Sequence, residues 1–299
     1  MSNCLNVKKR TIFLYMLPGI FWYSFIILIP ICLAVYYGMY DWSGGISMTF
    51  TGLDNYIEVL KDPVFIQSLK NNIFLTVVCL IGQIGIAFAL AMMLNGRHIR
   101  FKGLHRTVSY FPAVLSAVVI GFIWSMIYDY NYGLINTFLE AIGKSELTQA
   151  WLNNKNLVLL LAALPLIWQY IGYYLIIIMS ALSSVDPQIF EMAEIDGATG
   201  FKRAIHITLP LIKNSLIVCV TLCIAGNMKI FDHIYVMTQG GPGAASSVMA
   251  MYAYKTSFLS FKMGYGSAMS IVILIICLVL VGASQGLMQY FTREKEGRA

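Results

Sequence analysis

Few side chains in this sequence are of a type and spacing that could do chemistry. The four histidines are scattered, and neither an H-E-x-x-H pattern nor a clustered Cys/His spacing occurs. The phosphate-binding pattern G-x-x-x-x-G-K-[ST] is also absent, so the chain is not expected to bind ATP by itself. Cys219 and Cys223 are four apart on one helical face, but no His or carboxylate shares that face, which favours apolar packing over a metal site. We therefore expect no catalytic residue, no metal and no cofactor on this chain.

The elements that carry these side chains are apolar. The chain is 59% hydrophobic and only 11% charged, whereas a soluble domain is about one quarter charged. A helix needs roughly 20 apolar residues to cross a bilayer. Six stretches meet or approach this length, and the expected fold class is an all-α membrane protein in a single transmembrane domain, 1–299. The expected spans are 11–40, 71–95, 107–128, 157–183, 210–228 and 264–291.

The basic residues predict the orientation of these spans. An even number of crossings puts both termini and the loops at 96–106 and 186–213 on one side, and cytoplasmic loops are enriched in Lys and Arg. That side carries Lys8, Lys9, Arg10, Arg97, Arg100, Lys102, Arg106, Lys202, Arg203, Lys213, Arg293, Lys295 and Arg298. Both termini are thus expected to be cytoplasmic. The first apolar run is too long for a secretory signal, so we expect it to be retained.

The polar exception is Glu191–Pro210, EMAEIDGATGFKRAIHITLP, which lies between two apolar runs. Asp186 can cap a helix that begins with Pro187, and Gly197 can end it with a positive φ. Thr199 can cap a second short helix, and Pro210 would reset the chain where the fifth span begins. An apolar surface would be formed by Phe190, Met192, Ala193 and Ile195. From the residues alone, this surface either packs on the protein itself or docks a soluble partner.

The pattern E-x-A-x-x-x-G, from Glu191 to Gly197, is followed by Ile207-Thr208-Leu209-Pro210. This combination resembles the EAA loop of binding-protein-dependent ABC importer permeases, with Met192 where the middle alanine is usual. The string EIDGATGFKRAIHITLPLI is similar to the carbohydrate branch, of the maltose and glycerol-3-phosphate type. Weaker similarities run in the same order along nearly the whole chain, in FTGLDNYIEVL, RFKGLHRTVSYFPAVLS, GLIN and FDHIYVMTQGGPG.

The resemblance implies a type I ABC importer permease fold in the cytoplasmic membrane, and a subunit that is not itself an enzyme. It implies a second permease subunit (a paralogue in a heterodimer), two cytoplasmic ATPase subunits that hold ATP and Mg²⁺, and a solute-binding protein that delivers a sugar. The loop 186–210 would couple the spans to the ATPase. The residues that the resemblance assigns to this coupling are Glu191, Met192, Ala193, Gly197, Ile207, Leu209 and Pro210.

A sugar site needs hydrogen-bonding groups beside aromatic faces. The candidates within the spans are Trp168, Gln169, Tyr173, Tyr174, Asn227, Ser267 and Ser270. Hydrogen bonds between helices are the alternative role for most of them. Lys229 and Asp232, three residues apart, are expected to pair with each other near the outer surface.

Other functions stay open at this point. The importer could carry another small solute, such as a polyol or a phosphodiester. A different class would be an integral membrane enzyme or a stand-alone channel. The spans contain no acidic or basic residue at the bilayer centre, which argues against an ion-coupled transporter. We expect membrane lipid as a partner, anchored by the basic turn Asn95–Arg106, and no nucleic acid. An amphipathic interfacial helix is predicted at Leu53–Leu60.

Overall fold

The structure is a computed structural model that describes residues 9–96 and 99–296, with side chains as far as residue 288. Several of the basic residues that predict orientation lie outside the described part, namely Lys8, Arg97 and Arg298, and the side chains of Lys9, Arg293 and Lys295 are not described either. Within this part the chain divides into two compact units. Unit 1 comprises residues 1–62 and 253–274, and unit 2 comprises residues 63–252 and 275–299.

Unit 1 begins with a long apolar helix. It consists of α1 (Lys9–Tyr23), a π-helical turn (Ser24–Leu28) and α2 (Ile29–Gly38). A short antiparallel hairpin follows, β1 (Tyr40–Trp42) with β2 (Met48–Phe50), in which Tyr40 pairs with Phe50. This hairpin is an addition to the helical fold that the sequence predicts.

Unit 1 has a helix at the place predicted for an interfacial one, α3 (Asp54–Lys61). It buries Val59 and exposes Leu53, Ile57 and Leu60. Asn55 Nδ2 donates to the carbonyls of Gly38 (3.0 Å) and Tyr40 (2.9 Å), which fixes the helix against the hairpin. The unit closes with a π-helical turn (Lys255–Leu259) and the first part of α16 (Met263–Glu296).

Unit 2 starts with α4 (Pro63–Cys79), a π-helical turn (Leu80–Ile84) and α5 (Gly85–Leu94). This span begins at Pro63, whereas the sequence predicts residue 71, after the charge of Lys70. The early turns contain Ser68, Asn71 and Asn72, which are buried because they bind other segments of the unit. These polar residues are therefore part of the packed interior and not of a water-facing loop.

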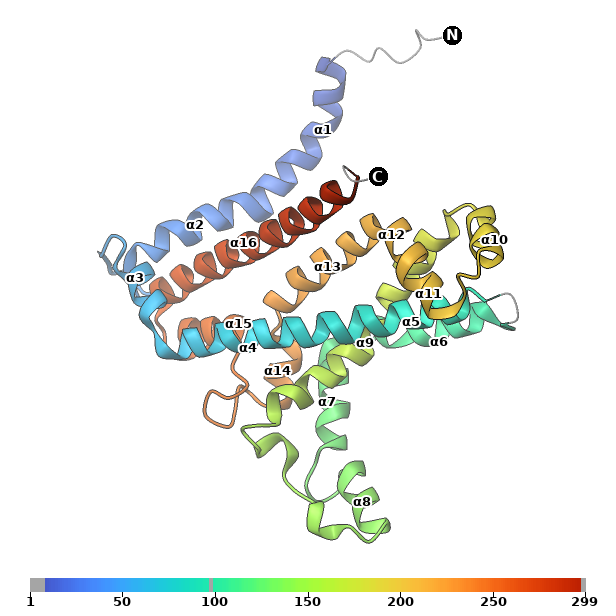
Figure 1. The fold of residues 1–299 in the computed structure, drawn as a ribbon. Helices are drawn as coiled ribbons and strands as arrows, with labels where there is room; N and C mark the ends of the chain where they lie inside the picture. Colours follow the sequence, from blue (N-terminus) through green and yellow to red (C-terminus); the bar gives the residue numbers. More distant parts are fainter. Residues whose placement is uncertain (1–8, 97–98, 297–299) are drawn as a thin grey trace. The chain divides into compact units, whose positions relative to one another are not determined.

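The third span is broken. The sequence predicts an uninterrupted helix over 107–128, but the structure has α6 (Lys102–Val114) and α7 (Ala117–Ile127), which meet at 94° (Figure 1). Pro112 has no backbone N–H to donate, and Leu115 and Ser116 adopt extended backbone angles. Proline in the last turn of an apolar helix is the sequence signal for this break.

The outer segment after α7 contains α8 (Leu134–Ala141) and two 3₁₀ turns, Ser145–Leu147 and Trp151–Asn153. The next span, α9 (Val158–Ser183), matches the predicted 157–183. Then come α10 (Pro187–Ile195), α11 (Gly200–Arg203), a π-helical turn (Ala204–Thr208), α12 (Leu209–Leu211) and α13 (Lys213–Met228). The helical run 200–211 meets α13 at 81°. The short helices α14 (Asp232–Met237) and α15 (Met249–Tyr254) precede α16.

The helical membrane fold is confirmed. Among the described residues, four helices are long and apolar enough to cross a bilayer, and the two bent pairs raise this number to six if each pair is one span. The buried core of unit 2 is formed by α4, α5, α9 and α13, with Leu75, Ala163 and Leu175 fully buried among them. This core supports two features at different ends of the helices, a polar segment at 186–211 and a cavity beside the break between α13 and α14.

Candidate functional site

The first candidate site is the polar segment 186–211, called here the coupling segment after the role that the resemblance of its sequence implies. Its helix α10 begins as the sequence predicts, because the Asp186 carboxylate accepts a hydrogen bond from the backbone N–H of Gln188 (3.0 Å) and Pro187 occupies the first helical position. It also ends as predicted. Gly197 has φ +71°, and the N–H groups of Gly197 and Ala198 bond the carbonyls of Glu194 (3.1 Å) and Ala193 (2.8 Å). This is a Schellman ending, so both ends of α10 are fixed locally.

The exposed apolar surface of the coupling segment differs from the predicted one. Ala193 is buried and Phe190 packs against the core of unit 2, so neither is available to a partner. The most exposed apolar residues are Met192 (58%), Ile195 (86%) and Phe201 (81%). The sequence analysis did not include Phe201 in this apolar surface. Its only sequence signal is an aromatic residue directly after a turn glycine. One face of the segment thus packs on the protein itself, and the other face is exposed.

Two further expectations for this segment are corrected. Thr199 occupies the N-cap position of α11, but its side chain makes no capping hydrogen bond. Pro210 lies near the end of the helical run 200–211 and does not start the fifth span, which begins at Lys213 after the bend. A π-helical turn directly before Leu209 opens the backbone, and such turns accommodate a proline that cannot donate its own hydrogen bond. Ile207 is half-buried, while Leu209 and Pro210 are exposed.

A cavity of about 650 Å³ lies behind α10, between this helix and the ends of α5 and α9. Its charged lining residues are Glu191, Glu194 and Arg203. The Arg203 guanidinium stands 5.9 Å above the centre of the Phe190 ring, within the range of a cation–π contact. On its inner face α10 is therefore held by Phe190 and the buried Ala193, beside this cavity.

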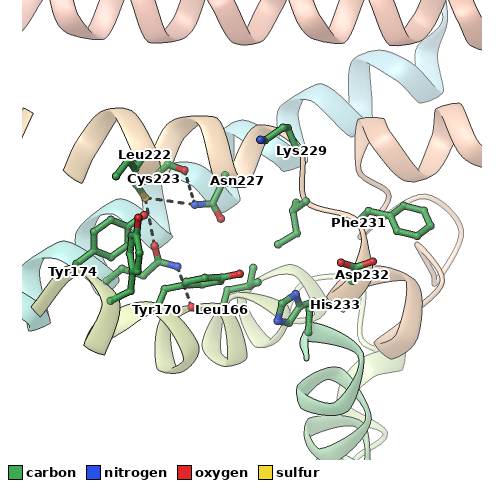
Figure 2. Close-up of a pocket in the computed structure, with 15 residues that line it drawn as sticks. Leu166, Tyr170, Tyr174, Leu222, Cys223, Asn227, Lys229, Phe231, Asp232 and His233 are labelled. Carbon is green, nitrogen blue, oxygen red and sulfur yellow. Dashed lines mark hydrogen bonds between the residues drawn. The ribbon is translucent and has the colours of Figure 1, made fainter. Parts of the chain in front are cut away.

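The second candidate site is a cavity of about 360 Å³ within the membrane-spanning part of unit 2, called here the membrane cavity (Figure 2). It lies where α13 ends and residues 229–231 connect to α14. Ligand pockets typically have volumes of about 300–1,000 Å³. The lining residues are Gln83, Ala117, Leu166, Tyr170, Tyr173, Tyr174, Leu222, Cys223, Gly226, Asn227, Lys229, Ile230, Phe231, Asp232 and His233.

The amides in the wall of the membrane cavity satisfy backbone groups and fix the helices. Gln83 Nε2 donates to the Leu166 carbonyl (2.9 Å), and Asn227 Nδ2 donates to the Cys223 carbonyl (2.9 Å). The Asn227 carbonyl in turn accepts from Asn72 Nδ2 (2.9 Å), at the turn where α13 ends. In a bilayer, carbonyls left over at a helix break need such partners. The cavity is thus a preformed feature with aromatic faces and a few fixed polar groups.

The structure divides the predicted solute-binding residues into three groups. Tyr173, Tyr174 and Asn227 line the membrane cavity. Trp168 and Gln169 lie on the same helix but are not among its lining residues; Trp168 packs edge-on against Trp124 at 6.3 Å. Ser267 and Ser270 belong to unit 1, where the Ser270 hydroxyl donates to the Gly266 carbonyl (2.9 Å).

Lys229 and Asp232 both line the membrane cavity, and in Figure 2 the Lys229 amine points away from the Asp232 carboxylate. The expected ion pair between them is therefore replaced by two separate charges beside the cavity. Sequence reasoning missed this because it considered spacing along a helix, whereas α13 stops at Met228 and α14 starts at Asp232. Residues 229–231 connect the two helices, so Lys229 lies in the connection and Asp232 lies on α14.

His233 is a cavity residue that sequence reasoning left unassigned. It is buried, and its Nε2 lies 2.7 Å from Gln169 Oε1. Its sequence signal was weak, since one histidine near the end of a span has many possible roles.

The sequence also contains a G-x-S-x-G pattern at Gly282–Gly286. In serine hydrolases this pattern forms a strand-to-helix turn that exposes the serine. Here it lies inside α16, and the Ser284 hydroxyl donates to the Val281 carbonyl of its own helix (2.8 Å). The pattern therefore has no nucleophile geometry.

Comparison with known proteins adds family information to this geometry. The model of the family described as binding-protein-dependent transport system inner membrane component matches residues 83–293. The probable ABC transporter permease protein YurN of Bacillus subtilis (strain 168) is 34% identical over 294 residues, 98% of this chain and 99% of that protein. The diacetylchitobiose uptake system permease protein NgcF of Streptomyces coelicolor is 31% identical over 266 residues, covering 85% of this chain and 75% of its own.

A third relative is the lactose transport system permease protein LacF of Rhizobium radiobacter, 30% identical over 270 residues, 89% of this chain and 90% of that protein. Among solved structures, a bacterial ABC transporter involved in the import of the polysaccharide alginate superimposes with a TM-score of 0.80 over 94% of this chain and 95% of that one. At 21% identity this likeness concerns the fold. A second structure of an alginate transporter, with the same score and coverage, is in complex with a pentasaccharide-bound periplasmic protein.

Proposed function

The chain belongs to the family of binding-protein-dependent transport system inner membrane components, and we propose that it is a permease subunit of an ATP-driven importer of a sugar. Family membership places it in the cytoplasmic membrane as a multi-pass subunit. The relatives named for lactose and diacetylchitobiose support a sugar as the solute. In this proposal ATP and Mg²⁺ bind to separate ATPase subunits.

The observation that carries the proposal is the membrane cavity. Sugars bind proteins through aromatic faces and fixed hydrogen-bonding groups. Tyr170, Tyr173, Tyr174 and Phe231 supply the aromatic surface, and Asn227 supplies an amide. The volume of about 360 Å³ lies within the range of ligand pockets in proteins, about 300–1,000 Å³.

The coupling segment supports the ATPase part of the proposal. The exposed side chains Met192, Ile195 and Phe201 would lie in a groove of an ATPase subunit, as an amphipathic helix docks in a hydrophobic groove. The capped ends of α10 and its packed inner face make this helix a rigid lever between α9 and α13. Closure of the ATPase pair would then shift the spans between two states for which the bound ATPase has different affinities.

The remaining partners in the proposal are a second permease subunit, a paralogue of this chain, and a solute-binding protein on the outer side. The complex of the alginate transporter with its periplasmic protein supports a solute-binding partner. The second permease would complete the transmembrane pathway beside unit 2.

Reconstitution tests the proposal. This chain, the second permease and the ATPase are placed in proteoliposomes with ATP inside, and the solute-binding protein is added outside. We then measure the uptake of radiolabelled lactose, diacetylchitobiose and a set of further oligosaccharides. ATP-dependent uptake of one sugar that requires its binding protein is expected. Uptake of only polyols or phosphodiesters would move the proposal to another solute class, and transport without an ATPase would refute it.

A second experiment tests the coupling segment. Residues 190–197 are replaced by a flexible Gly/Ser linker, and the complex is assayed for uptake and for ATP hydrolysis. Loss of uptake is expected because the lever is removed. A control linker of equal length at residues 142–149, in the outer loop, should retain more uptake. Full uptake with the 190–197 linker would exclude this segment from coupling.

A further inference from the structure

We propose that His233 and Gln169 form a buried joint that holds two broken helices in register around the membrane cavity, and that both are positioning residues for transport. The inference rests on the proposed function in one respect: the cavity is taken as the place that the solute crosses. Hydrogen bonding between helices is the alternative that the sequence leaves open for Gln169, whereas no motif points to His233.

The joint is a chain of two hydrogen bonds that starts on α14 and ends at the break between α6 and α7. His233 Nε2 lies 2.7 Å from Gln169 Oε1, and Gln169 Nε2 donates to the Leu115 carbonyl at 3.1 Å. Both side chains are only 2% exposed. The two hydrogen bonds therefore lie in the interior, where a low dielectric makes them stronger than bonds exposed to water.

This geometry decides which group donates in the hydrogen bond between His233 and Gln169. The Leu115 carbonyl can only accept, so the nitrogen of the Gln169 amide must face it and the oxygen must face His233. The acceptor oxygen then requires that His233 Nε2 carries a hydrogen. His233 thus acts as a donor in a fixed tautomer, and any replacement must donate from the same place to keep the joint.

The two elements joined in this way are the ones that shape the cavity. The first is the corner between α6 and α7, where Leu115 would have an unsatisfied carbonyl and from which Ala117 lines the cavity. The second is the segment Lys229–His233, which forms the other side of the cavity. Gln169 reaches from α9 to both (Figure 2 shows His233 at the cavity wall).

Close backbone packing makes each connected element rigid on its own. A Cβ on Gly172 would collide with the backbone of Ser109, so α9 and α6 approach closely there. A Cβ on Gly121 would lie 3.2 Å from Val236 Cβ and 3.6 Å from His233 Cα, so α7 and α14 also approach closely. The pair α6 with α9 and the pair α7 with α14 are thus two stiff bodies, and the joint connects them beside the cavity.

Loss of either side chain would loosen the joint, because the remaining partner is left as a buried unsatisfied polar group. The expected consequence is a cavity that opens more often. Cys223 is a native reporter for this opening, because it lines the cavity and is itself buried. The rate at which a small thiol reagent modifies Cys223 therefore measures access without any knowledge of the solute.

The experiment uses the complete transporter in membrane vesicles, in a background in which the other five cysteines are replaced by alanine. The rate of Cys223 modification by N-ethylmaleimide is measured for the parent, Gln169→Leu, His233→Leu, the double variant and His233→Gln. ATP hydrolysis in the absence of binding protein is recorded for each as a measure of assembly. Gln285→Leu is the matched control, since this glutamine joins α16 to Thr221 of α13 (3.3 Å) and does not line the cavity.

Each Leu variant should raise the modification rate about 10-fold, the range expected when a buried hydrogen bond is broken. The double variant should be no faster than the faster single variant, since all three break the same joint. His233→Gln keeps a donor and should stay within about twofold of the parent, as should the Gln285→Leu control. ATP hydrolysis without binding protein should remain detectable in every variant, which shows that the transporter has assembled.

Three results would overturn the inference: unchanged rates in both Leu variants, multiplicative effects in the double variant, or a His233→Gln rate equal to that of His233→Leu. Gln169→Met serves where Gln169→Leu does not assemble, and loss of assembly in both would show a purely structural role. Absence of sugar uptake by the parent would refute the proposed function but leave the thiol rates as a valid test of the joint.

Discussion

The coupling segment and the membrane cavity belong to the same unit, yet they are built in opposite ways. The coupling segment consists of residues adjacent in sequence, and its form depends on local contacts such as the Asp186 cap and the Gly197 turn. The membrane cavity collects residues from Gln83 to His233, and its form depends on contacts between distant helices. The difference predicts that substitutions in the first region act through partner binding and helix ends, while substitutions in the second act on solute handling.

The largest effect is expected from Gly197→Val. Gly197 has φ +71°, a conformation that a β-branched residue adopts only under strain, so the turn after α10 would be lost. Uptake should fall more than 10-fold with loss of co-purifying ATPase, if the coupling segment docks this subunit. Gly282→Val is the control, because no atom lies within 4 Å of a Cβ at that helical position. Equal effects of both variants would show that the comparison between regions is wrong.

A similar but smaller effect is expected from Phe201→Asp. This side chain is 81% exposed, so its replacement should not unfold the protein, but it would place a charge in the proposed docking surface. Loss of an aromatic anchor at an interface typically costs about 2 kcal/mol or more. We expect ATPase affinity to fall at least 10-fold in a pull-down titration. Phe138→Asp, 63% exposed on α8, should leave that affinity unchanged.

In the membrane cavity, Tyr173→Phe should change solute affinity and leave ATPase binding intact. The substitution removes one hydroxyl from the cavity, and a neutral hydrogen bond contributes about 0.5–1.5 kcal/mol. The KM for uptake is expected to rise about 3- to 10-fold, as measured with increasing concentrations of loaded binding protein. Tyr15→Phe, on the exposed surface of α1, is the control. An unchanged KM would remove Tyr173 from the solute site.

The smallest effect is expected from Asp186→Ala. It removes the acceptor for the Gln188 N–H, and the loss of such a cap costs about 1 kcal/mol. Because the segment is held at its other end by the Gly197 turn, ATP hydrolysis stimulated by binding protein should fall only about two- to fivefold. Asp196→Ala changes a carboxylate on the other end of the same helix and should have less effect. A larger loss of ATP hydrolysis in Asp196→Ala than in Asp186→Ala would mean that the charge of this segment, and not the helix cap, supports the stimulation.

These contrasts also explain what could be predicted from the sequence. The start and end of α10 were predictable because Asp186, Pro187 and Gly197 act on their own neighbours. The exposure of Phe201 and the inward packing of Phe190 were not, because they depend on where α5 and α9 end. Local chemistry decides helix ends, whereas the face that is buried is decided by the neighbouring helices.

The same limit applies to the cavity. Tyr173, Tyr174 and Asn227 were selected for their chemistry and do line it, but Gln169 was selected for the same reason and is engaged by Leu115 and His233. No rule of periodicity separates these cases. Gln169 does not line the cavity because the helix break at Leu115 creates a carbonyl that a buried amide must satisfy.

The buried Ser68, Asn71 and Asn72 of α4 have a practical consequence for exchanging parts between related permeases. Asn71 Nδ2 donates to the Ala245 and Ser247 carbonyls (3.1 and 2.8 Å), and Asn72 Oδ1 accepts from the Met249 N–H (2.8 Å). A chimera that imports a foreign segment 227–249 to change solute preference therefore needs the matching first turns of α4 from the same donor. The functional module for such grafting is discontinuous in the gene.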